Sequence, residues 1–199
     1  MHTSVALLAA ALALALAACS GTDPGAEHGI TEPVRGGVLE YGTDVQPVAG
    51  GIDPYSANSF AAQNINVQIY ESLLTKDADG KLQPGLAESW QQPDETTYRF
   101  DLREATFSNG EPLTVEDVVF SYQTMASAGA GQSQLLRQLA SVTAVDEDTV
   151  EFRLSAPNAT FINVVAGEGT GLIVNKKWYT STPDTERQRT ALGTGPFKL

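Results

Sequence analysis

A regular alternation of apolar and polar residues predicts a strand near the middle of the chain. Over Thr97–Arg103, the side chains of Tyr98, Phe100 and Leu102 share one face, and polar side chains occupy the other. A period of two is typical of a half-buried strand, which packs one face on a core and turns the other to solvent. We therefore expect Tyr98 and Phe100 to lie in the core, together with Trp90.

Five further segments carry strand-like patterns. Val142–Val145 and Thr149–Ser155 alternate on either side of a short acidic segment, which predicts a β-hairpin. Short runs rich in apolar and β-branched residues predict strands at Val38–Thr43 and Leu172–Asn175, and Phe197–Leu199 is expected to open another. Strands and helices are therefore expected in one mixed fold.

Apolar residues at helical spacing predict helices in four places. One begins after Thr114, where Asp117 follows three residues on in an arrangement that resembles a capping box. The apolar stripe of this helix consists of Val115, Val118, Val119 and Tyr122. The other helices are expected over Asn58–Lys76, Gln132–Ser141 and Ala159–Ala166.

Glycine-containing turns separate these elements. Asp79-Gly80 and Asn109-Gly110 are strong turn signals, because glycine adopts left-handed backbone conformations without steric strain. Between them, Pro84–Trp90 is expected to form a short turn of helix ahead of the central strand. Asp77 and Asp79 also faintly resemble a calcium loop, but further ligands are missing at the required spacing, which favours a plain turn.

The N-terminal residues differ in composition from the rest of the chain. Residues 4–18 are almost entirely Ala, Leu and Val, a run too short for a membrane span but typical of a secretory signal peptide. It ends in Leu16-Ala17-Ala18-Cys19, which resembles the bacterial lipobox. We expect a signal peptide over 1–18 and a diacylglycerol on Cys19. The alternative is that Cys19 is an ordinary residue of a cleaved segment.

Residues 19–36 follow this signal and are polar and rich in Gly and Pro. Such a composition lacks the apolar residues that a core needs, so it predicts a flexible linker. The folded domain is then expected over residues 37–199. The mature protein would be tethered to a membrane without spanning it.

Composition limits the possible functions. The chain has 199 residues, of which 42% are hydrophobic, so a packed core is expected. Its 24 acidic and 12 basic residues give a net charge of -12, which argues against nucleic acid as a partner because phosphates demand a basic surface. The acidic excess mostly serves solubility and does not by itself indicate a cationic ligand.

Catalytic and metal-binding motifs are missing from the sequence. The only histidines, His2 and His28, lie in the expected signal peptide and linker, so a His-based triad in the domain is excluded. Cys19 is the only cysteine, which excludes an intramolecular disulfide and a Cys-based zinc site. The acidic residues at 146–148 are expected at a solvated hairpin turn. A secreted hydrolase with a carboxylate dyad is therefore the weakest hypothesis, and we predict no catalytic residue, metal or cofactor.

One ordered string of motifs resembles a known family. It consists of Tyr70-Glu71, Asp77–Gly80, Pro84–Trp90, Tyr98–Arg103 and Phe107–Tyr122, flanked by Gly37–Leu39, Asp53-Pro54 and Gly193–Phe197. Their order and spacing are similar to those of the extracellular solute-binding proteins of family 5, which deliver oligopeptides, dipeptides, nickel chelates or sugars to ABC transporters. The resemblance covers about residues 36 to 199.

The resemblance implies a fold and a mechanism. The fold is α/β, of the periplasmic-binding-protein-like type II kind (cluster C), in which two lobes close over a ligand by a hinge motion. Family members are usually more than twice as long as this chain, so we expect an N-terminal fragment that holds most of one lobe. The implied protein is a lipid-anchored substrate-binding component of an ABC importer, outside the cytoplasm at the cell membrane. Its partners would be a peptide or other small solute, a permease and the bilayer.

Two segments are candidates for ligand contact. By resemblance, the loop after the first strand lies at the mouth of the cleft, which makes Gly42, Thr43 and Asp44 the first choice. The alternative is that these three residues only connect the strand to the following loop and contact no ligand. Gly169 and Thr170 are the second choice, because clustered glycines let a backbone approach a ligand closely, and their alternative is a connector between subdomains. Two hypotheses stay open for the whole molecule: a solute receptor, and a truncated surface lipoprotein that binds nothing.

Overall fold

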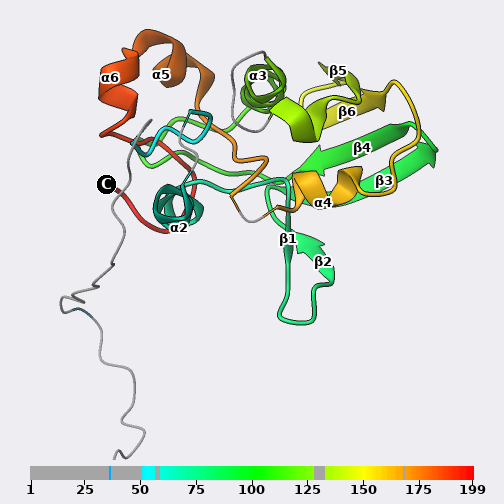
Figure 1. Cartoon of the computed structure of the whole chain (residues 1–199), viewed down its shortest axis with the longest axis horizontal. Helices are drawn as coiled ribbons and strands as arrows, with labels where there is room; N and C mark the ends of the chain where they lie inside the picture. Colours follow the sequence, from blue (N-terminus) through cyan, green and yellow to red (C-terminus); the bar gives the residue numbers. More distant parts are fainter. Residues whose placement is uncertain (1–35, 37–50, 57–58, 128–132, 168) are drawn as a thin grey trace, which may run out of the picture. The chain divides into compact units, whose positions relative to one another are not determined.

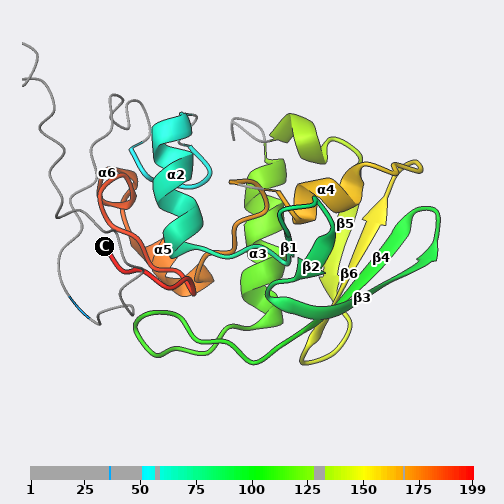
Figure 2. The ribbon, with the colours of Figure 1, turned by 90° about the horizontal axis from the view of Figure 1, so that it is seen from below.

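Four antiparallel strands form the larger sheet of the structure, a computed structural model that describes Gly36 and residues 51–56, 59–127, 133–167 and 169–199. The strands are β3 (Ala87–Asp94), β4 (Thr97–Leu102), β5 (Leu139–Ala144) and β6 (Thr149–Leu154). Their order across the sheet is β3-β4-β6-β5, so β4 and β6 are central and β3 and β5 are the edges (Figure 2). Except for Gly36, all described residues belong to the unit Gly42–Leu199.

The alternation predicted for the central strand is confirmed in β4. Tyr98, Phe100 and Leu102 are buried, while Arg99 is exposed. The prediction fails only at the first residue, since Thr97 was expected on the polar face and is buried. On the outer face, Arg99 Nε donates to a carboxylate oxygen of Glu151 in β6 at 2.7 Å. The predicted hairpin is confirmed as β5 and β6, although β5 begins three residues earlier than expected.

Aromatic rings fill the space between the sheet and the helices that cover one of its faces. The helices are α3 (Val115–Ala126) and α4 (Phe161–Val165). The ring of Phe152 lies edge-on to the rings of Phe100 and Tyr122, with centroids 5.3 and 4.7 Å apart. Aromatic pairs in this geometry contribute stability beyond the area that they bury. The core is therefore centred on β4, β6 and α3.

The remaining elements are short. They are α2 (Phe60–Ile69), the hairpin of β1 (Leu74–Lys76) and β2 (Leu82–Pro84), the 3₁₀ turn η1 (Ser133–Leu136), α5 (Lys176–Ser181) and α6 (Asp184–Arg187). In Figures 1 and 2, α2, α5 and α6 lie on the side of α3 away from the sheet. α3 thus separates the sheet from a small helical region.

The predicted capping box is present at the start of α3. Asp117 Oδ2 accepts the backbone N–H of Thr114 at 3.0 Å and its hydroxyl at 2.9 Å. Asp117 Oδ1 accepts the backbone N–H of Lys176 at 2.7 Å, which ties α3 to the start of α5. The turn predicted at Asn109-Gly110 is also confirmed, since Gly110 has a φ of 89°.

Two of the predicted helices are wrong in part. The helix expected over Asn58–Lys76 ends at Ile69, and its last three residues form β1. In the described residues of Gln132–Ser141, the expected helix is a single 3₁₀ turn followed by β5. In both segments the leucines have helical spacing, but pairing of β1 with β2 and of β5 with β6 decides their conformation.

The turn of helix expected at Pro84–Trp90 is wrong. Pro84 ends β2, and β3 begins at Ala87. Gly85 joins the two strands, and a Cβ there would lie 2.6 Å from a neighbouring backbone oxygen. Trp90 was expected in the core but is only half-buried, because it stands in an edge strand.

Two predicted strands are not formed. Leu172–Asn175 is buried, but Ile173 and Val174 donate their N–H groups to partners in two different segments, so no ladder arises. Phe197–Leu199 runs along the end of α2 without strand pairing. The strand expected at Val38–Thr43 lies outside the described residues.

Candidate functional site

The structure describes one of the two segments that we expected to contact a ligand. Gly42, Thr43 and Asp44 lie outside the described residues, as does Cys19. Gly169 and Thr170 are described, in the loop that follows α4. The candidate site in the described residues therefore consists of this loop and the elements beside it.

The loop of Gly169 is packed tightly against two helices. Gly169 has a φ of 81°, and a Cβ on it would lie 3.1 Å from the Gln63 side chain of α2. The Thr170 hydroxyl donates to the carbonyl oxygen of Val164 at 3.1 Å, at the end of α4. The positive φ and the close packing account for a glycine at position 169 without any ligand. Contact of this loop with a ligand stays a prediction.

A large aromatic side chain lies on the helix that this loop touches. Phe60, the first residue of α2, is 84% exposed. Gln63 follows three residues later, so it lies on the same helix face as Phe60, and its side chain lies close to Gly169. We call Phe60, Gln63, Gly169 and Thr170 the α2–loop surface. It combines an apolar ring with polar and backbone groups, which suits a solute that carries both kinds of group.

Buried polar atoms in and near α2 have no hydrogen-bond partner among the described residues. Asn66 is 3% exposed, and its Oδ1 has no hydrogen-bond partner. The same is true of the Tyr70 hydroxyl and of Thr194 Oγ1. Burial raises the pKa of the Tyr70 phenol well above its usual range, so the group is neutral and keeps its proton for donation. These atoms offer hydrogen bonds that the described residues do not use.

Asp53 forms a buried ion pair with the helical region. Its carboxylate accepts the Tyr55 N–H at 3.0 Å, the Tyr179 hydroxyl at 3.2 Å and Arg187 Nε at 3.1 Å. The Arg187 guanidinium lies 4.1 Å from the centre of the Tyr179 ring. Sequence reasoning marked Asp53 only as part of a motif and missed Arg187, because their 134-residue separation leaves no local signal. Both carboxylate oxygens of Asp53 and all three guanidinium nitrogens of Arg187 have hydrogen-bond partners. The cluster therefore holds the segments together and is not a candidate ligand site.

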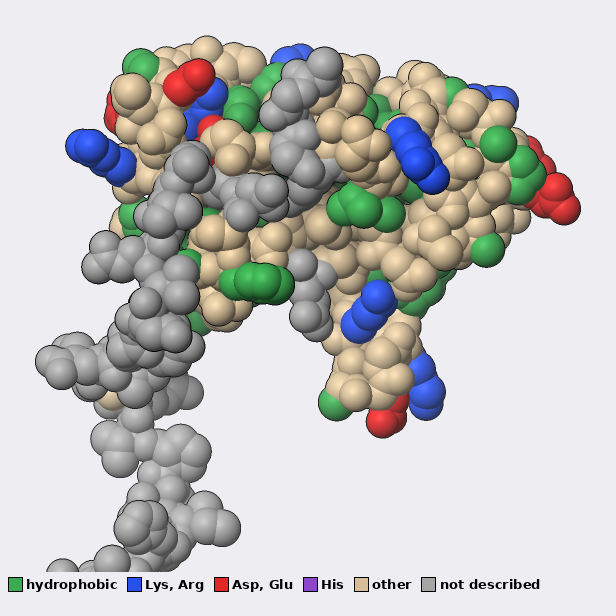
Figure 3. All heavy atoms as spheres, viewed as in Figure 1, with side chains coloured by type: hydrophobic (Ala, Val, Ile, Leu, Met, Phe, Trp, Pro, Cys, Tyr) green, Lys and Arg blue, Asp and Glu red, His purple; other side chains and the backbone are tan. Residues whose placement is uncertain are grey.

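The described residues contain no candidate metal site, and no cluster of basic side chains lies on the face in Figure 3. They contain no group of three or more His, Cys, Asp or Glu side chains that could hold a metal ion. Asp77 Oδ1 accepts the N–H groups of Asp79 and Lys81, at 3.0 and 2.9 Å, as in a plain turn. On the face in Figure 3, the basic side chains of the described residues stand singly among other groups. Within the same residues, none of the helices has the length and apolar character for a membrane span.

The chain is similar to known proteins over most of this structure. The model of the bacterial extracellular solute-binding proteins, family 5 (Middle), matches residues 81–199. The periplasmic oligopeptide-binding protein OppA of Haemophilus influenzae is 40% identical over 90 residues, which are 44% of this chain and 16% of that protein. OppA of Escherichia coli is 30% identical over 153 residues, which are 67% of this chain and 27% of that protein.

The fold is similar to solved structures of the same class. Haemophilus influenzae OppA in complex with the peptide RPPGFSPFR has a TM-score of 0.69 and 27% sequence identity, over 77% of this chain and 34% of that one. The structural neighbours are type II periplasmic binding proteins, which confirms the predicted fold class. In these three comparisons the matched part covers 16%, 27% and 34% of the other chain, about a third or less of its length.

Proposed function

The chain belongs to family 5 of the bacterial extracellular solute-binding proteins, and from this we propose that it is part of the substrate-binding component of an ABC importer for oligopeptides or dipeptides. One observation carries the proposal: the family match runs from β2 to the last residue, and the relatives are named for binding these peptides. The protein works outside the cytoplasm, as its periplasmic relatives do. It hands its solute to a permease in the membrane.

The α2–loop surface is consistent with a peptide as the solute. A peptide offers backbone N–H and C=O groups together with apolar side chains. Phe60 provides an exposed aromatic ring of the kind that dominates recognition surfaces, and Gln63 on the same face of α2 adds a polar amide. Gly42, Thr43 and Asp44 keep their proposed role as strand-like partners of the peptide backbone.

We also propose that Cys19 carries a lipid and holds the protein at the membrane. The motif Leu16–Cys19 after a short apolar run supports this, and two acyl chains give stable anchoring where one would be marginal. Growth of the producing cell with radiolabelled palmitate is expected to label the protein. A Cys19→Ser variant that keeps the label would rule out this anchor.

The length of the chain keeps a second function open. The matched segments make up 16% and 27% of two curated relatives, and we propose that the chain corresponds to most of one lobe of a two-lobed receptor. A single lobe offers half of the contacts that a closed cleft makes. The second candidate is therefore a surface lipoprotein that does not bind solutes.

Thermal unfolding with and without peptide tests the receptor function. The natural protein that carries this chain is expected to unfold at a higher temperature in the presence of a mixed oligopeptide pool, since a ligand that binds only the folded state stabilises it. Free amino acids at the same concentration are expected to leave the temperature unchanged. No shift with any peptide pool would favour the second candidate.

A pair of variants tests the α2–loop surface itself. Phe60→Ser is expected to reduce the peptide-induced shift, because it removes the exposed ring beside the loop. Leu135→Ser is the matched control, since Leu135 is also an exposed apolar residue, 47% accessible, but belongs to η1. Equal effects of the two substitutions would argue against the α2–loop surface and leave the receptor function standing.

A further inference from the structure

One exposed turn contains the only Asn-Gly pair of the chain, Asn109-Gly110. Two backbone hydrogen bonds close the turn: the Phe107 N–H donates to the Glu111 oxygen, and the Gly110 N–H donates to the Phe107 oxygen, both at 2.8 Å. The side chain of Asn109 and the backbone of Gly110 are exposed. A Cβ added to Gly110 would meet no described atom within 4 Å, so the space beside this residue is open.

The side-chain amide of Asn109 is held against the backbone that follows it. Its Oδ1 accepts the Glu111 N–H at 3.0 Å. This bond draws electron density from the side-chain carbonyl, as a donor in an oxyanion hole does, and makes the carbon Cγ a better target for a nucleophile. The nearest backbone nitrogen that could attack Cγ is that of Gly110, which has no side chain to hinder the approach.

We propose that Asn109 is a site of spontaneous modification, at which its side-chain amide is converted to aspartate and isoaspartate with water as the only co-reactant. The Gly110 nitrogen gives its proton to solvent and bonds to Cγ of Asn109, while the side-chain nitrogen takes up a proton and leaves as ammonia. The product is a cyclic imide. Water then adds to one of the two imide carbonyl carbons and breaks its bond to the Gly110 nitrogen. Breakage at Cγ gives aspartate, and breakage at the backbone carbon gives isoaspartate.

The turn hydrogen bond of Gly110 slows this reaction without preventing it. The Gly110 N–H must leave the Phe107 oxygen before the nitrogen can lose its proton. Exposed turns open locally at a much smaller free-energy cost than that of global unfolding. The reaction is therefore slower in the folded protein than in a peptide of the same sequence, but it does not require unfolding. Because the nucleophile is the deprotonated nitrogen, the reaction is faster at higher pH.

The conversion places a second carboxylate beside Glu111. Hydrogen bonding to Lys177, and then to Asn109, lowers the pKa of the Glu111 carboxyl. The carboxylate of Glu111 accepts Lys177 Nζ at 2.9 Å and Asn175 Nδ2 at 3.2 Å, so it joins the turn to the start of α5. A carboxylate at position 109 has no amide proton to donate to Glu111 and repels it instead. The modification is therefore expected to weaken the contact between the turn and α5.

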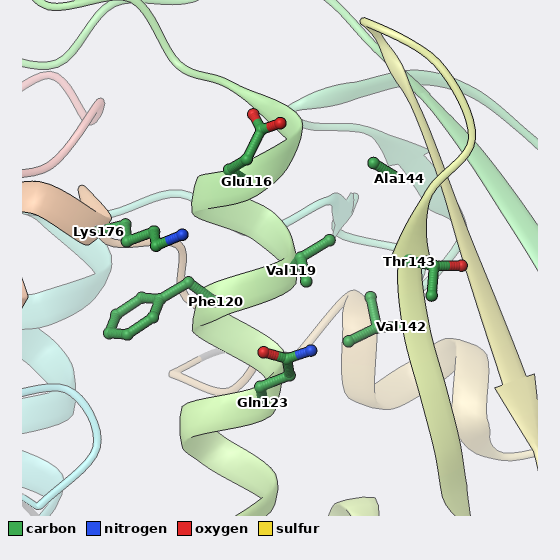
Figure 4. Close-up of a pocket in the computed structure, with 8 residues that line it drawn as sticks. All are labelled: Glu116, Val119, Phe120, Gln123, Val142, Thr143, Ala144 and Lys176. Carbon is green, nitrogen blue, oxygen red and sulfur yellow. The ribbon is translucent and has the colours of Figure 1, made fainter.

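A second attachment of α5 keeps this effect local. Lys176, at the start of α5, projects toward α3 in Figure 4 and lines a pocket of about 310 Å³ together with Glu116 and Phe120. Its N–H donates to Asp117 Oδ1 at 2.7 Å. Modification of Asn109 changes neither partner of this bond. The modified protein is therefore expected to stay folded, with α5 still attached to α3.

Peptide mapping of the incubated protein tests the proposal. The full-length chain, purified in detergent, is kept at pH 6 or at pH 9 and digested with trypsin, beside a sample digested without incubation. The peptide Glu104–Arg137 contains Asn109 as its only asparagine, and tandem mass spectrometry locates the converted residue. We expect both aspartate and isoaspartate at position 109, resolved by chromatography, with faster conversion at pH 9. No conversion at pH 9, or aspartate without isoaspartate, would overturn the proposal.

Asn158 provides an internal control in the same sample. Its Oδ1 accepts the Thr160 N–H at 3.0 Å, as Asn109 Oδ1 accepts the N–H two residues on, but Ala159 follows it in place of glycine. The methyl group of Ala159 hinders attack by its nitrogen. We therefore expect conversion of Asn158 to be slower by about tenfold or more. Equal rates at the two asparagines would contradict the role given to the glycine.

Two variants separate the reaction from its consequence. Asn109→Gln requires a larger ring for the same attack and is expected to suppress conversion, whereas an unchanged rate would assign the signal to another residue. Asn109→Asp reproduces one product and is expected to lower the temperature of unfolding by a few degrees at most. In a Glu111→Gln background this shift is expected to be smaller, because the repulsion is removed. Equal shifts in the two backgrounds would reject repulsion of Glu111 as the consequence.

Discussion

Asp53 connects three segments through one buried carboxylate. It is 2% exposed, and its oxygens hold a loop, α5 and the residue Arg187 in fixed positions. Removing one partner of a buried pair leaves the other charge without compensation, which costs more than the pair itself contributes. The cluster is therefore the place in the described structure where one side-chain change should have the largest electrostatic effect.

We predict that Asp53→Asn lowers the free energy of unfolding by about 3 kcal/mol, because the Arg187 guanidinium loses its buried counter-charge. Urea unfolding monitored by circular dichroism measures the change. Asp184→Asn is the control, since this second carboxylate partner of Arg187 is 85% exposed and should contribute less than about 1 kcal/mol. Equal losses for both variants would contradict the role given to Asp53.

The carboxylates on the solvent face of the sheet predict a dependence of stability on pH. Hydrogen bonding to Arg99, and then to Arg153, lowers the pKa of Glu151 below its usual value. A carboxyl group with a lowered pKa in the folded state stabilises the fold fully above its unfolded pKa of about 4.3. That contribution is lost as the pH falls through the folded pKa. We therefore expect stability to decrease on acidification below about pH 4.3, and Glu151→Gln to reduce the slope, as measured by urea unfolding from pH 6 to pH 3. An unchanged slope in this variant would refute the assignment.

At the scale of elements, sequence patterns correctly predicted the features that depend on interactions between neighbouring residues. The alternation in β4 and the capping box of α3 were both found from a few neighbouring residues. The helix expected from the leucines of Gln132–Ser141 failed, because pairing between β5 and β6 decides the conformation of Leu139. The strand order and the Asp53–Arg187 pair join distant residues, so no local pattern contains them.

The candidate site was predictable to a smaller extent. The glycines of the loop at Gly169 mark it as unusual in the sequence, but the pattern does not say that Gln63 packs on it. Phe60 lies within the helix predicted over Asn58–Lys76, and its side chain is exposed. Whether an apolar residue at the start of a helix is exposed depends on which other segments pack beside it. The spacing of apolar residues along the sequence carries no information about those segments.

We predict that Asp117→Ala destabilises the protein by about 2 kcal/mol. Asp117 both caps α3 through Thr114 and holds the first N–H of α5, so two helix starts lose an acceptor. Thermal unfolding measures the loss. The neighbouring Glu116→Ala removes an exposed acidic residue of the same first turn and should cost less than about 1 kcal/mol. A larger effect of Glu116→Ala would exclude capping as the cause.

At the scale of the whole molecule, the described unit is similar to part of longer proteins. Its relatives are several times longer, and Haemophilus influenzae OppA shares its fold over 34% of that chain. In a two-lobed receptor, affinity comes from contacts that both lobes make in the closed state. The affinity of one lobe should therefore be a small part of that of the whole protein.

We predict that residues 20–199 alone bind oligopeptides weakly, with a dissociation constant above the micromolar range, because the proposed two-lobed cleft needs contacts from both lobes. Isothermal titration calorimetry with a mixed peptide pool measures it. The natural protein that carries this chain, titrated with the same pool, is the control and should bind more tightly. A micromolar or lower dissociation constant for residues 20–199 would show that a single lobe is sufficient.

The strand order of the sheet has a consequence for how the chain reaches its location outside the cytoplasm. The central strands β4 and β6 are far apart in the sequence: Arg99 of β4 and Glu151 of β6, which contact each other, are separated by 52 positions. Until these strands pair, β3 and β4 form a two-stranded hairpin, which is marginally stable in water, and closing a long loop slows folding. A precursor that threads through a secretion channel must stay unfolded until it has crossed. Late pairing of the central strands would keep the chain in that transport-competent state, with folding completed on the far side.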